Sequence, residues 1–351
     1  MDTNISGDAG MSVNTDANTG MADGTSPAMP RTARAASRVI AYRSIDSTNS
    51  EARRLLLDGS LRLDDGGIAV IAADVQTAGR GRLDHAGVSR PGESFIVTFV
   101  ASVPRSLATD VSINGWLQMT AGLAAVDGLR EAMGECGATP IAPDADRGAE
   151  EGMEESAEES VEEDAEESVE EDANDGFMLK WPNDVFLDGR KLGGILSEMA
   201  SLPQDGATGE RGSESGSERL AIIFGIGLNL AIPADHLPTS QSTSLQLHYA
   251  PLPDPETLRD IIAARIAASL GSRLHRLETD RVREARRVHD EAERICYTLG
   301  RHAVAHFVDG TEMEGEAMVL NADASLDLRT PDGNVHTIRT ADVGVLPDPC
   351  V

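Results

Sequence analysis

Lysine occurs at only two positions in this chain, and both lie in one short stretch. Of 30 basic residues only Lys180 and Lys191 are lysines, and they fall within the segment KWPNDVFLDGRKLGGIL. The lysine ammonium is a compact point charge, whereas the arginine guanidinium is a wider planar fork. A compact cation at the end of a strand can lie between a carboxylate and a phosphate and stabilise whichever oxygen becomes more negative. We therefore interpret Lys180 as a catalytic cation; the alternative is two surface lysines whose proximity has no role.

A second motif that can bind an anion is GRGR, residues 79–82, which lies between two expected strands. Glycine lets the backbone approach a ligand, and the guanidiniums of Arg80 and Arg82 match the oxygens of phosphate or carboxylate. The motif occurs once and is not part of an RGG array, and an ordinary exposed loop is the alternative. Asn183 and Asp184 follow the first lysine where the chain turns, and they suit a ribose, a phosphate or the shell of a Mg²⁺ ion.

The elements that must position these motifs can be predicted from apolar periodicity and from capping residues. Thr48 and Glu51 form a T-x-x-E capping box that predicts a helix, with Gly59 as its end. Runs rich in Val and Ile predict strands at 67–76 and 94–102, and we also expect strands at 177–181 and 220–230. Helical spacing predicts helices at about 111–133, 255–277 and 279–295. Strands and helices alternate irregularly, so we expect an α+β fold with a mixed sheet rather than a doubly wound parallel sheet.

The chain divides into a tail, a main domain and a small β domain. Residues 1–36 are rich in Gly, Ser, Thr, Asn and Asp, which predicts a disordered tail, and they lack the pattern of a secretory signal. The main domain is expected over 37–299. Residues 300–351 contain short strands joined by Asp-Gly turns, which predicts a small β-barrel domain.

Two polar segments interrupt the main domain. Residues 144–175 hold 17 acidic residues against one Arg and contain EESVEEDA twice. Like charges at this density repel one another and cannot bury apolar surface, so we interpret the segment as a disordered, solvated insertion. A specific docking role is the alternative. Residues 203–218 form a second polar loop.

Composition excludes several classes of protein. The net charge is −29 and no basic patch is present, which argues against a nucleic-acid partner. The sequence has no run of 18 apolar residues, so we expect no membrane span. Cys136, Cys296 and Cys350 form no CxxC pair, which indicates reduced thiols in a cytoplasmic protein and argues against a zinc site.

Four motifs, taken in order, resemble a biotin–protein ligase, also called holocarboxylase synthetase. They are DSTNSEA (46–52), QTAGRGRLDH (76–85), KWPNDVFLDGRKLGGILSE (180–198) and GIGLNL (225–230). The resemblance covers roughly residues 38–348 and implies a catalytic domain of the biotin/lipoate ligase type with a C-terminal SH3-like β domain. Repressor members of the family begin with a winged helix, whereas a polar tail stands in that place here. The resemblance therefore implies a ligase without a DNA-binding role.

The resemblance also implies a reaction in two steps. Biotin and Mg-ATP give biotinyl-5′-AMP and pyrophosphate, and the biotinyl group then passes to one lysine of a biotin carboxyl carrier domain. Lys180 and Arg82 would be catalytic, and no metal ligand is assigned. The implied biotin-binding residues are Ser47, Thr48, Asn49, Gln76, Arg80, Gly81, Arg82 and Lys180. The implied nucleotide-binding residues are Arg80, Arg82, Asn183, Lys191, Gly194 and Asn229.

The sequence departs from the family after GRGR. His85 and Gly87 stand where the family usually has an Arg and a Trp, which concerns the adenine side of the site. Two alternatives remain open: a lipoate–protein ligase, and a non-enzymatic biotin sensor or adaptor. The sequence does not decide between a monomer and a homodimer, and it does not identify the carrier protein.

Overall fold

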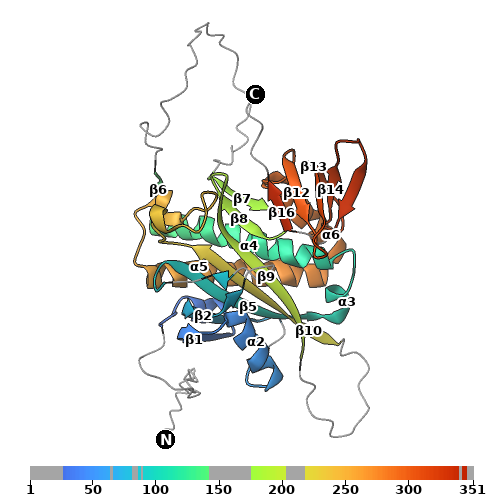
Figure 1. The fold of residues 1–351 in the computed structure, drawn as a ribbon. Helices are drawn as coiled ribbons and strands as arrows, with labels where there is room; N and C mark the ends of the chain where they lie inside the picture. Colours follow the sequence, from blue (N-terminus) through green and yellow to red (C-terminus); the bar gives the residue numbers. More distant parts are fainter. Residues whose placement is uncertain are drawn as a thin grey trace, which may run out of the picture.

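A seven-stranded mixed sheet forms the centre of the computed structural model, which describes residues 27–63, 66–80, 86–87, 90–141, 175–202, 218–339 and 342–345 (Figure 1). The strand order is β1-β2-β5-β10-β9-β8-β7. Only β1 and β2 pair in parallel, and the other neighbours in this sheet are antiparallel. The predicted α+β fold with a mixed sheet is therefore confirmed. The strands are β1 (Arg38–Ile45), β2 (Ile68–Gln76), β5 (Ser94–Pro104), β7 (Phe177–Lys180), β8 (Asp184–Leu187), β9 (Arg190–Ser201) and β10 (Arg219–Asn229).

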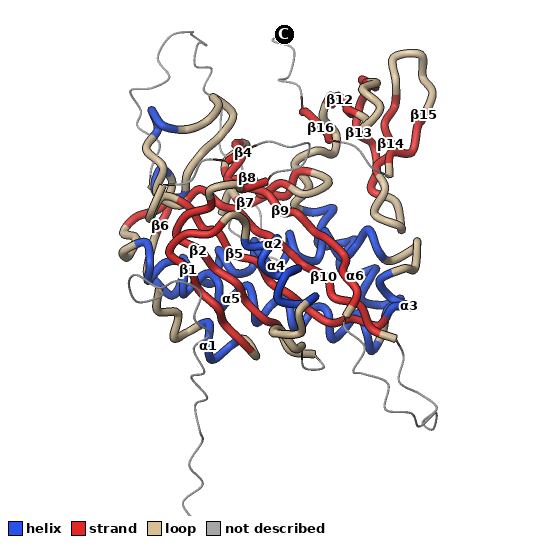
Figure 2. Tube along the Cα trace, turned by 60° about the horizontal axis from the view of Figure 1, so that its bottom comes forward, coloured by secondary structure: helices blue, strands red, loops and turns tan. Residues whose placement is uncertain are grey.

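The two faces of this sheet are covered differently. The helices α4 (Asn114–Cys136), α5 (Pro255–Thr279) and α6 (Arg281–Arg294) gather on one side, as Figure 2 shows. On the other side the short helix α2 (Thr48–Leu57) packs over a smaller cluster of β2, β5 and β10 side chains. Because alternate residues of a strand face opposite sides, each central strand supplies side chains to both clusters. The short helix leaves part of its face of the sheet available for a ligand.

Helix α4 lies against α5 at very short range. A Cβ atom at Gly128 would lie 2.5 Å from the Ile266 side chain and 3.0 Å from its backbone nitrogen. Glycine therefore permits the close approach of the two helices. The three long helices were predicted with ends within about three residues, which is the usual uncertainty of helix boundaries.

The prediction of a disordered tail is wrong for residues 27–36. A short helix α1 (Thr32–Ala35) forms there, and Met29 and Thr32 are buried. The backbone N–H of Thr32 donates to the Asp260 carboxylate at 2.9 Å, and its hydroxyl donates to the same group at 2.8 Å. A buried carboxylate on α5 thus anchors this segment to the main domain. Residues 1–26 lie outside the described part of the chain.

The start of α2 also differs from the prediction. Ser47 is the N-cap residue, and its hydroxyl accepts the backbone N–H of Ser50 at 3.4 Å. Thr48 is the first helical residue, and its hydroxyl contacts other side chains instead of the helix end. Glu51 accepts a hydrogen bond from the Tyr42 hydroxyl at 2.6 Å rather than closing a capping box. Because Ser47 caps the helix, the Thr48 hydroxyl is available for contacts with β2 and β5.

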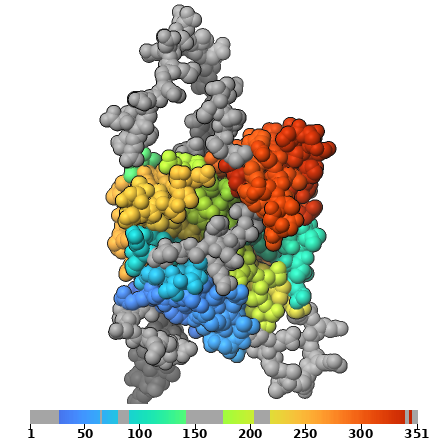
Figure 3. Space-filling model, viewed as in Figure 1, coloured from blue at the N-terminus to red at the C-terminus, as the bar shows by residue number. Residues whose placement is uncertain are grey.

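A five-stranded antiparallel sheet forms the C-terminal domain, in the order β15-β14-β13-β12-β16. Gly310 and Gly333 have positive φ in the Asp-Gly turns, as the sequence predicted. The apolar residues of this sheet belong to the same continuous cluster as those between the main sheet and its helices, so the domain packs directly against the rest of the molecule (Figure 3). Its strands are β12 (His302–His306), β13 (Glu312–Leu320), β14 (Leu326–Arg329), β15 (Val335–Ile338) and β16 (Asp342–Val345).

The remaining elements are short. They are α3 (Arg105–Ala108), the hairpin of β3 (Gly79–Arg80) and β4 (Ala86–Gly87), the pair of β6 (Thr139–Pro140) and β11 (Tyr249–Ala250), and the 3-10 turns η2 (Ala234–His236) and η3 (Leu245–Leu247). The predicted insertion 144–175 and loop 203–218 lie outside the described residues except at their last positions, Asp175 and Glu218. Within the described ranges, no helix is both long and apolar enough to cross a membrane.

Candidate active site

Three glycines lie near one another in the middle of the main sheet, on the face that carries α2. Gly227 lies on the central strand β10 and is exposed, and no atom of the described residues lies within 4 Å of the position that its Cβ would take. Gly225, on the same face, is covered by the Asn49 side chain, whose Oδ1 would be 2.2 Å from a Cβ there. Gly194 on β9 pairs with Gly227. We call this surface the glycine trough (Gly194, Gly225 and Gly227).

The predicted catalytic lysine lies at one end of the trough. Lys180 pairs with Asp184 across the β7–β8 hairpin, Asp184 pairs with Gly194, and Gly194 pairs with Gly227. Directly paired residues of neighbouring strands face the same side of a sheet, so these four positions form one row. The alternation of FMLK sends Phe177 and Leu179 into the core below and leaves the lysine on the trough face.

A buried carboxylate holds both lysines of the chain. Lys180 Nζ lies 3.0 Å from Asp184 Oδ2, and Lys191 Nζ lies 2.8 Å from Asp184 Oδ1. Lys180 and Asp184 are only 9% and 4% exposed, whereas Lys191 is half exposed. Two ammoniums and one carboxylate leave a local charge of one positive unit, which suits an anionic ligand. We call this group the lysine end (Lys180, Asp184 and Lys191).

Neutral polar side chains meet at the other end of the trough. Gln76 Oε1 accepts the backbone N–H of Thr48 at 2.8 Å and lies 3.0 Å from its hydroxyl. Thr98 donates its hydroxyl to Asn49 Oδ1 at 2.7 Å, and Asn49 Nδ2 donates to Glu198 at 2.9 Å. We call this group the amide end (Thr48, Asn49, Gln76 and Thr98). The structure therefore brings together three of the predicted biotin-binding residues, and Ser47 precedes them as the cap of α2.

Thr98 and Glu198 were missed by the sequence analysis, although Thr98 left a signal. It is a fully buried hydroxyl in the otherwise apolar run FIVTFV of β5. A buried polar group requires a hydrogen-bond partner, so a threonine in a central strand indicates a polar contact on that face. Glu198 ends the KLGGILSE motif and also pairs with Arg53 at 3.0 Å.

The residues predicted to frame the nucleotide hold the backbone around the lysine end. Asn183 Nδ2 donates to the carbonyl of Ile195 at 3.0 Å, and Asn229 Nδ2 donates to that of Thr243 at 2.8 Å. Lys191 makes backbone hydrogen bonds with residues 241 and 243 at 2.8 Å each. At Gly194 a Cβ would lie 3.1 Å from Asp184 Oδ1, so the glycine leaves room for the shared carboxylate. The segment 241–243 had no distinctive sequence signal.

The GRGR motif is described only in part. Gly79 and Arg80 form β3, which pairs with Ala86 and Gly87 of β4. This hairpin begins three residues after Gln76, so it starts at the amide end. Gly81, Arg82 and His85 and the side chain of Arg80 lie outside the described part, and the roles given to them remain predictions.

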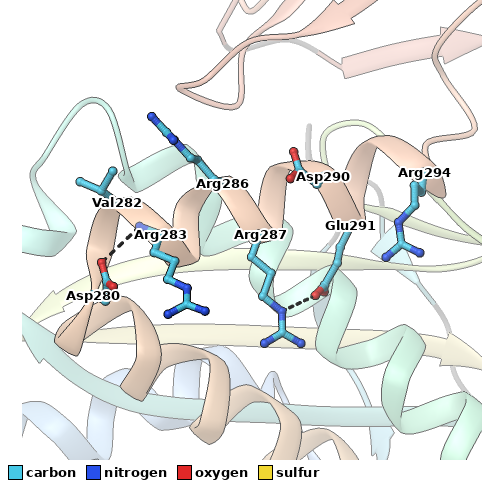
Figure 4. A pocket seen from close by; sticks show the side chains of 8 residues that line it. All are labelled: Asp280, Val282, Arg283, Arg286, Arg287, Asp290, Glu291 and Arg294. Carbon is cyan, nitrogen blue, oxygen red and sulfur yellow. Dashed lines mark hydrogen bonds and ion pairs between the residues drawn. The ribbon is translucent and has the colours of Figure 1, made fainter.

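Two hollows on the helical side of the sheet are separate from the trough. One of about 500 Å³ runs along α6, and a larger one of about 950 Å³ lies among α4, α5 and α6. Figure 4 shows that Arg283, Arg287 and Arg294 point to one side of α6, while Arg286 points to the other. Arg287 pairs with Glu291 at 2.8 Å, so the charge of its guanidinium is compensated. Neither hollow contains the lysine end.

Neither a thiolate nor a metal cluster contributes to the site as described. Burial raises the pKa of the Cys296 thiol, which lies beside Leu179, so this cysteine stays protonated. Among the residues that the structure describes, no group of three or more His, Cys, Asp and Glu side chains is placed to hold a metal ion.

Comparison with known proteins shows which family the chain resembles. Residues 41–204 match the model of the biotin/lipoate A/B protein ligase family. A biotin protein ligase from Aquifex aeolicus, solved with biotin and ATP, aligns with a TM-score of 0.53 and 19% identity over 88% of this chain and 99% of that chain. The apo structure of the Aquifex aeolicus enzyme aligns with a TM-score of 0.51 and 16% identity over 88% and 98%. At these identities the structural matches show a shared fold.

Curated relatives narrow the class. The biotin--[acetyl-CoA-carboxylase] ligase of Mycobacterium tuberculosis is 26% identical over 230 residues, which are 65% of this chain and 60% of that protein. The bifunctional ligase/repressor BirA of Bacillus spizizenii is 25% identical over 172 residues, which are 48% and 34%. The chain is therefore similar to the biotin/lipoate A/B protein ligase family over residues 41–204, slightly less than half of its length, and a biotin--[acetyl-CoA-carboxylase] ligase is among its curated relatives. The matched part spans less than two thirds of the length of these curated relatives.

Proposed function

We propose that this chain is a biotin–[biotin carboxyl-carrier protein] ligase of the kind that serves acetyl-CoA or acyl-CoA carboxylases. It would activate biotin with ATP to biotinyl-5′-AMP and transfer the biotinyl group to one lysine of a carrier domain. The observation that carries the proposal is the row from Lys180 through Asp184 and Gly194 to Gly227, which places an ammonium at the end of an open glycine floor. The complexes of relatives with biotin and ATP support the choice of ligands.

The two ends of the trough suit the two ends of biotin. Thr48 and Asn49 carry the neutral donors and acceptors that a ureido ring needs, and the buried Thr98 hydroxyl holds both side chains in place. The glycine floor gives room for the ring and the chain of the ligand between the two ends. The positive lysine end then meets the carboxylate. A biotin bound in this direction has its reacting group next to Lys180.

The first step requires positioning and charge stabilisation more than proton transfer. A carboxylate oxygen of biotin attacks the α-phosphorus of ATP, the bond from that phosphorus to the bridging oxygen breaks, and pyrophosphate leaves. The carboxylate is already a nucleophile, so no base is needed, and Lys180 lies where two anions must approach each other. Its ammonium can exchange Asp184 for the developing charge, while Lys191 keeps the carboxylate paired.

The second step transfers the acyl group. The amine of the carrier lysine attacks the acyl carbon of biotinyl-5′-AMP, the acyl–phosphate bond breaks, AMP leaves, and the amine loses a proton. We propose that Arg80 and Arg82 hold the adenylate phosphate, which remains a prediction from the GRGR motif.

We propose that Mg²⁺ enters as MgATP. Both oxygens of Asp184 are paired with lysines, so this carboxylate is not arranged as a metal ligand. When bound, the ion would neutralise phosphate charge and help pyrophosphate to leave. We place the reaction in the cytoplasm with a carrier domain as protein partner, and we propose no nucleic-acid or membrane partner.

The test is a transfer assay with the purified chain. Incubation with ATP, Mg²⁺, biotin and a purified carrier domain should add one biotinyl group to the carrier, detected by intact mass, and the chain should catalyse ATP–pyrophosphate exchange that depends on biotin. A parallel incubation with lipoate separates the two branches of the family. Lipoylation instead of biotinylation would assign the chain to the lipoate branch. Biotin binding without exchange would make it a sensor.

A further inference from the structure

The strand that carries the proposed catalytic lysine is held at its outer edge by the C-terminal part of the chain. We call residues 295–298, between α6 and the C-terminal domain, the linker segment. Leu179 of β7 donates its backbone N–H to this segment at 2.8 Å and accepts one from it at 2.7 Å. The backbone N–H of Trp181 donates to Thr298 Oγ1 at 2.9 Å. The residues immediately before and after Lys180 are therefore both bound to the linker segment.

Both tryptophans of the chain donate their indole N–H groups to one turn of the C-terminal domain. We call residues 321–325, between β13 and β14, the docking turn. Trp116 of α4 donates to the carbonyl of Ala322 at 2.7 Å, and Trp181 donates to that of Ala324 at 2.8 Å. Both rings are buried. The chain has two tryptophans among 351 residues, and the indole N–H groups of both bond to this one turn.

The docking turn is held in one conformation by its own hydrogen bonds and by its surroundings. Ala324 has a φ of +65°, which is uncommon for a residue other than glycine. The Asp323 carboxylate accepts the backbone N–H of Ser325 at 3.1 Å and also its hydroxyl. A Cβ at Gly115 would lie 2.6 Å from the carbonyl oxygen of Asp323, so α4 approaches the turn as closely as glycine allows.

We infer that the docking turn positions Lys180 through Trp181, an inference that rests on the proposed function. Trp181 is fixed at its backbone by the linker segment and at its indole by the docking turn, and both lie C-terminal to the main sheet in sequence. The position of Lys180 therefore depends on where the C-terminal domain holds the Trp181 ring. A displacement of reacting groups by about 1 Å can lower a rate on the order of 100-fold. Trp181 is thus a positioning residue.

The two tryptophans provide a matched pair of variants. Trp181→Phe and Trp116→Phe each remove one indole donor from the same turn and each leave one buried carbonyl without that donor. We expect similar decreases of the thermal midpoint. At a temperature well below both midpoints, biotin-dependent pyrophosphate exchange should show kcat lowered about tenfold in Trp181→Phe, with KM for biotin and ATP within about twofold. In Trp116→Phe we expect kcat within about twofold of the unmodified chain.

A second readout does not depend on activity. Amide hydrogen exchange at residues 179–181 should become faster in Trp181→Phe and stay unchanged in Trp116→Phe, and this comparison holds even if the proposed function fails. If Trp181→Phe does not fold, Thr298→Val takes its place, because it removes the acceptor of the Trp181 backbone N–H and should speed amide exchange and lower kcat. Thr298→Ser keeps the acceptor, so it should return amide hydrogen exchange and kcat to the values of the unmodified chain. Equal losses of kcat in both tryptophan variants, or unchanged amide exchange in Trp181→Phe, would overturn the inference.

Discussion

The lysine end and the amide end of the glycine trough are built on different physical principles. At the lysine end, one carboxylate compensates two ammoniums, and the strand is supported by the linker segment and the C-terminal domain. At the amide end, neutral groups of α2, β2 and β5 hydrogen bond to one another within the main domain. Such a network of neutral hydrogen bonds holds the side chains in a fixed arrangement against which a neutral ring can bind. At the lysine end, an ammonium can stabilise an incoming anion only if it gives up its contact with Asp184.

The largest effect is expected from removal of the shared carboxylate. Asp184→Asn leaves Lys180 buried beside a neutral group, and truncation of one partner of a buried ion pair costs about 3–5 kcal/mol. We expect the free energy of unfolding to fall by about 3 kcal/mol, the lower end of this range. Only Lys180 is left buried without its partner, because Lys191 is half exposed and its ammonium can be solvated by water. Chemical denaturation measures the loss. Lys191→Gln is the control and should cost less than about 1 kcal/mol, as for an exposed pair; an equal loss in both variants would contradict the role given to the buried lysine.

A smaller effect is expected when the amide end is broken. Thr98→Val keeps the shape of the side chain but leaves Asn49 Oδ1 without its donor, which costs about 1–3 kcal/mol for a buried group. If the amide end holds the biotin ring, the KM for biotin should rise severalfold while the KM for ATP stays unchanged. Pyrophosphate exchange at varied biotin and varied ATP measures both. As a control, Thr32→Val removes an equally buried hydroxyl from the Asp260 contact and should lower stability without changing either KM.

The adenine side should respond more weakly. If the Trp that the family usually has in the place of Gly87 stacks on the base, Gly87→Trp should lower the KM for ATP by about 5- to 10-fold, the lower part of the range of roughly 1–3 kcal/mol for such stacking. The lower part is expected because ordering the new side chain opposes part of the gain. Gly87→Ala tests whether β4 tolerates a side chain. An unchanged KM for ATP in Gly87→Trp, together with a normal Gly87→Ala variant, would show that this position does not contact adenine.

The smallest effect is expected for the acidic insertion, whose composition gives it no role in either end of the trough. Replacing residues 144–174 with a short Gly-Ser linker should leave the thermal midpoint and the adenylation rate nearly unchanged, because insertions in connections cost little stability. Asp175 is kept because it pairs with Arg130 and its carbonyl accepts the Tyr249 hydroxyl at 2.8 Å. A loss of carrier biotinylation alone, sensitive to salt, would instead make the insertion a docking element.

The closeness of the two lysines and Asp184 was predictable because they are near one another in the sequence, although the sequence analysis gave Asp184 a ribose, phosphate or Mg²⁺ role and not this pairing. Lys180 and Asp184 lie on the two strands of one hairpin, and Lys191 follows on the next strand, so local spacing brings them together. The central strands were also predictable, since β2, β5 and β10 are buried runs of Val, Ile and Phe. In each case the information is contained in fewer than about twenty neighbouring residues.

Contacts between distant segments were not predictable. Thr32 is bound by a carboxylate on α5, and the local composition of its segment gives no sign of that partner. The shift of the helix cap to Ser47 follows from contacts of Thr48 with β2 and β5, which local capping rules do not include. The same holds for the docking turn, whose two indole donors come from α4 and from the end of β7.

The central claim is that Lys180 acts as a point charge between two anions, and Lys180→Arg tests it most directly. The variant keeps the positive charge but replaces the compact ammonium, which lies 3.0 Å from Asp184 Oδ2, with a wider planar fork. We measure biotin-dependent pyrophosphate exchange of the unmodified chain, of Lys180→Ala and of Lys180→Arg. Loss of a preorganised charge-stabilising group costs about 100- to 1000-fold, and we predict a loss of this order for Ala and nearly as large a loss for Arg. Exchange by the Arg variant at more than about a tenth of the unmodified rate would contradict the account.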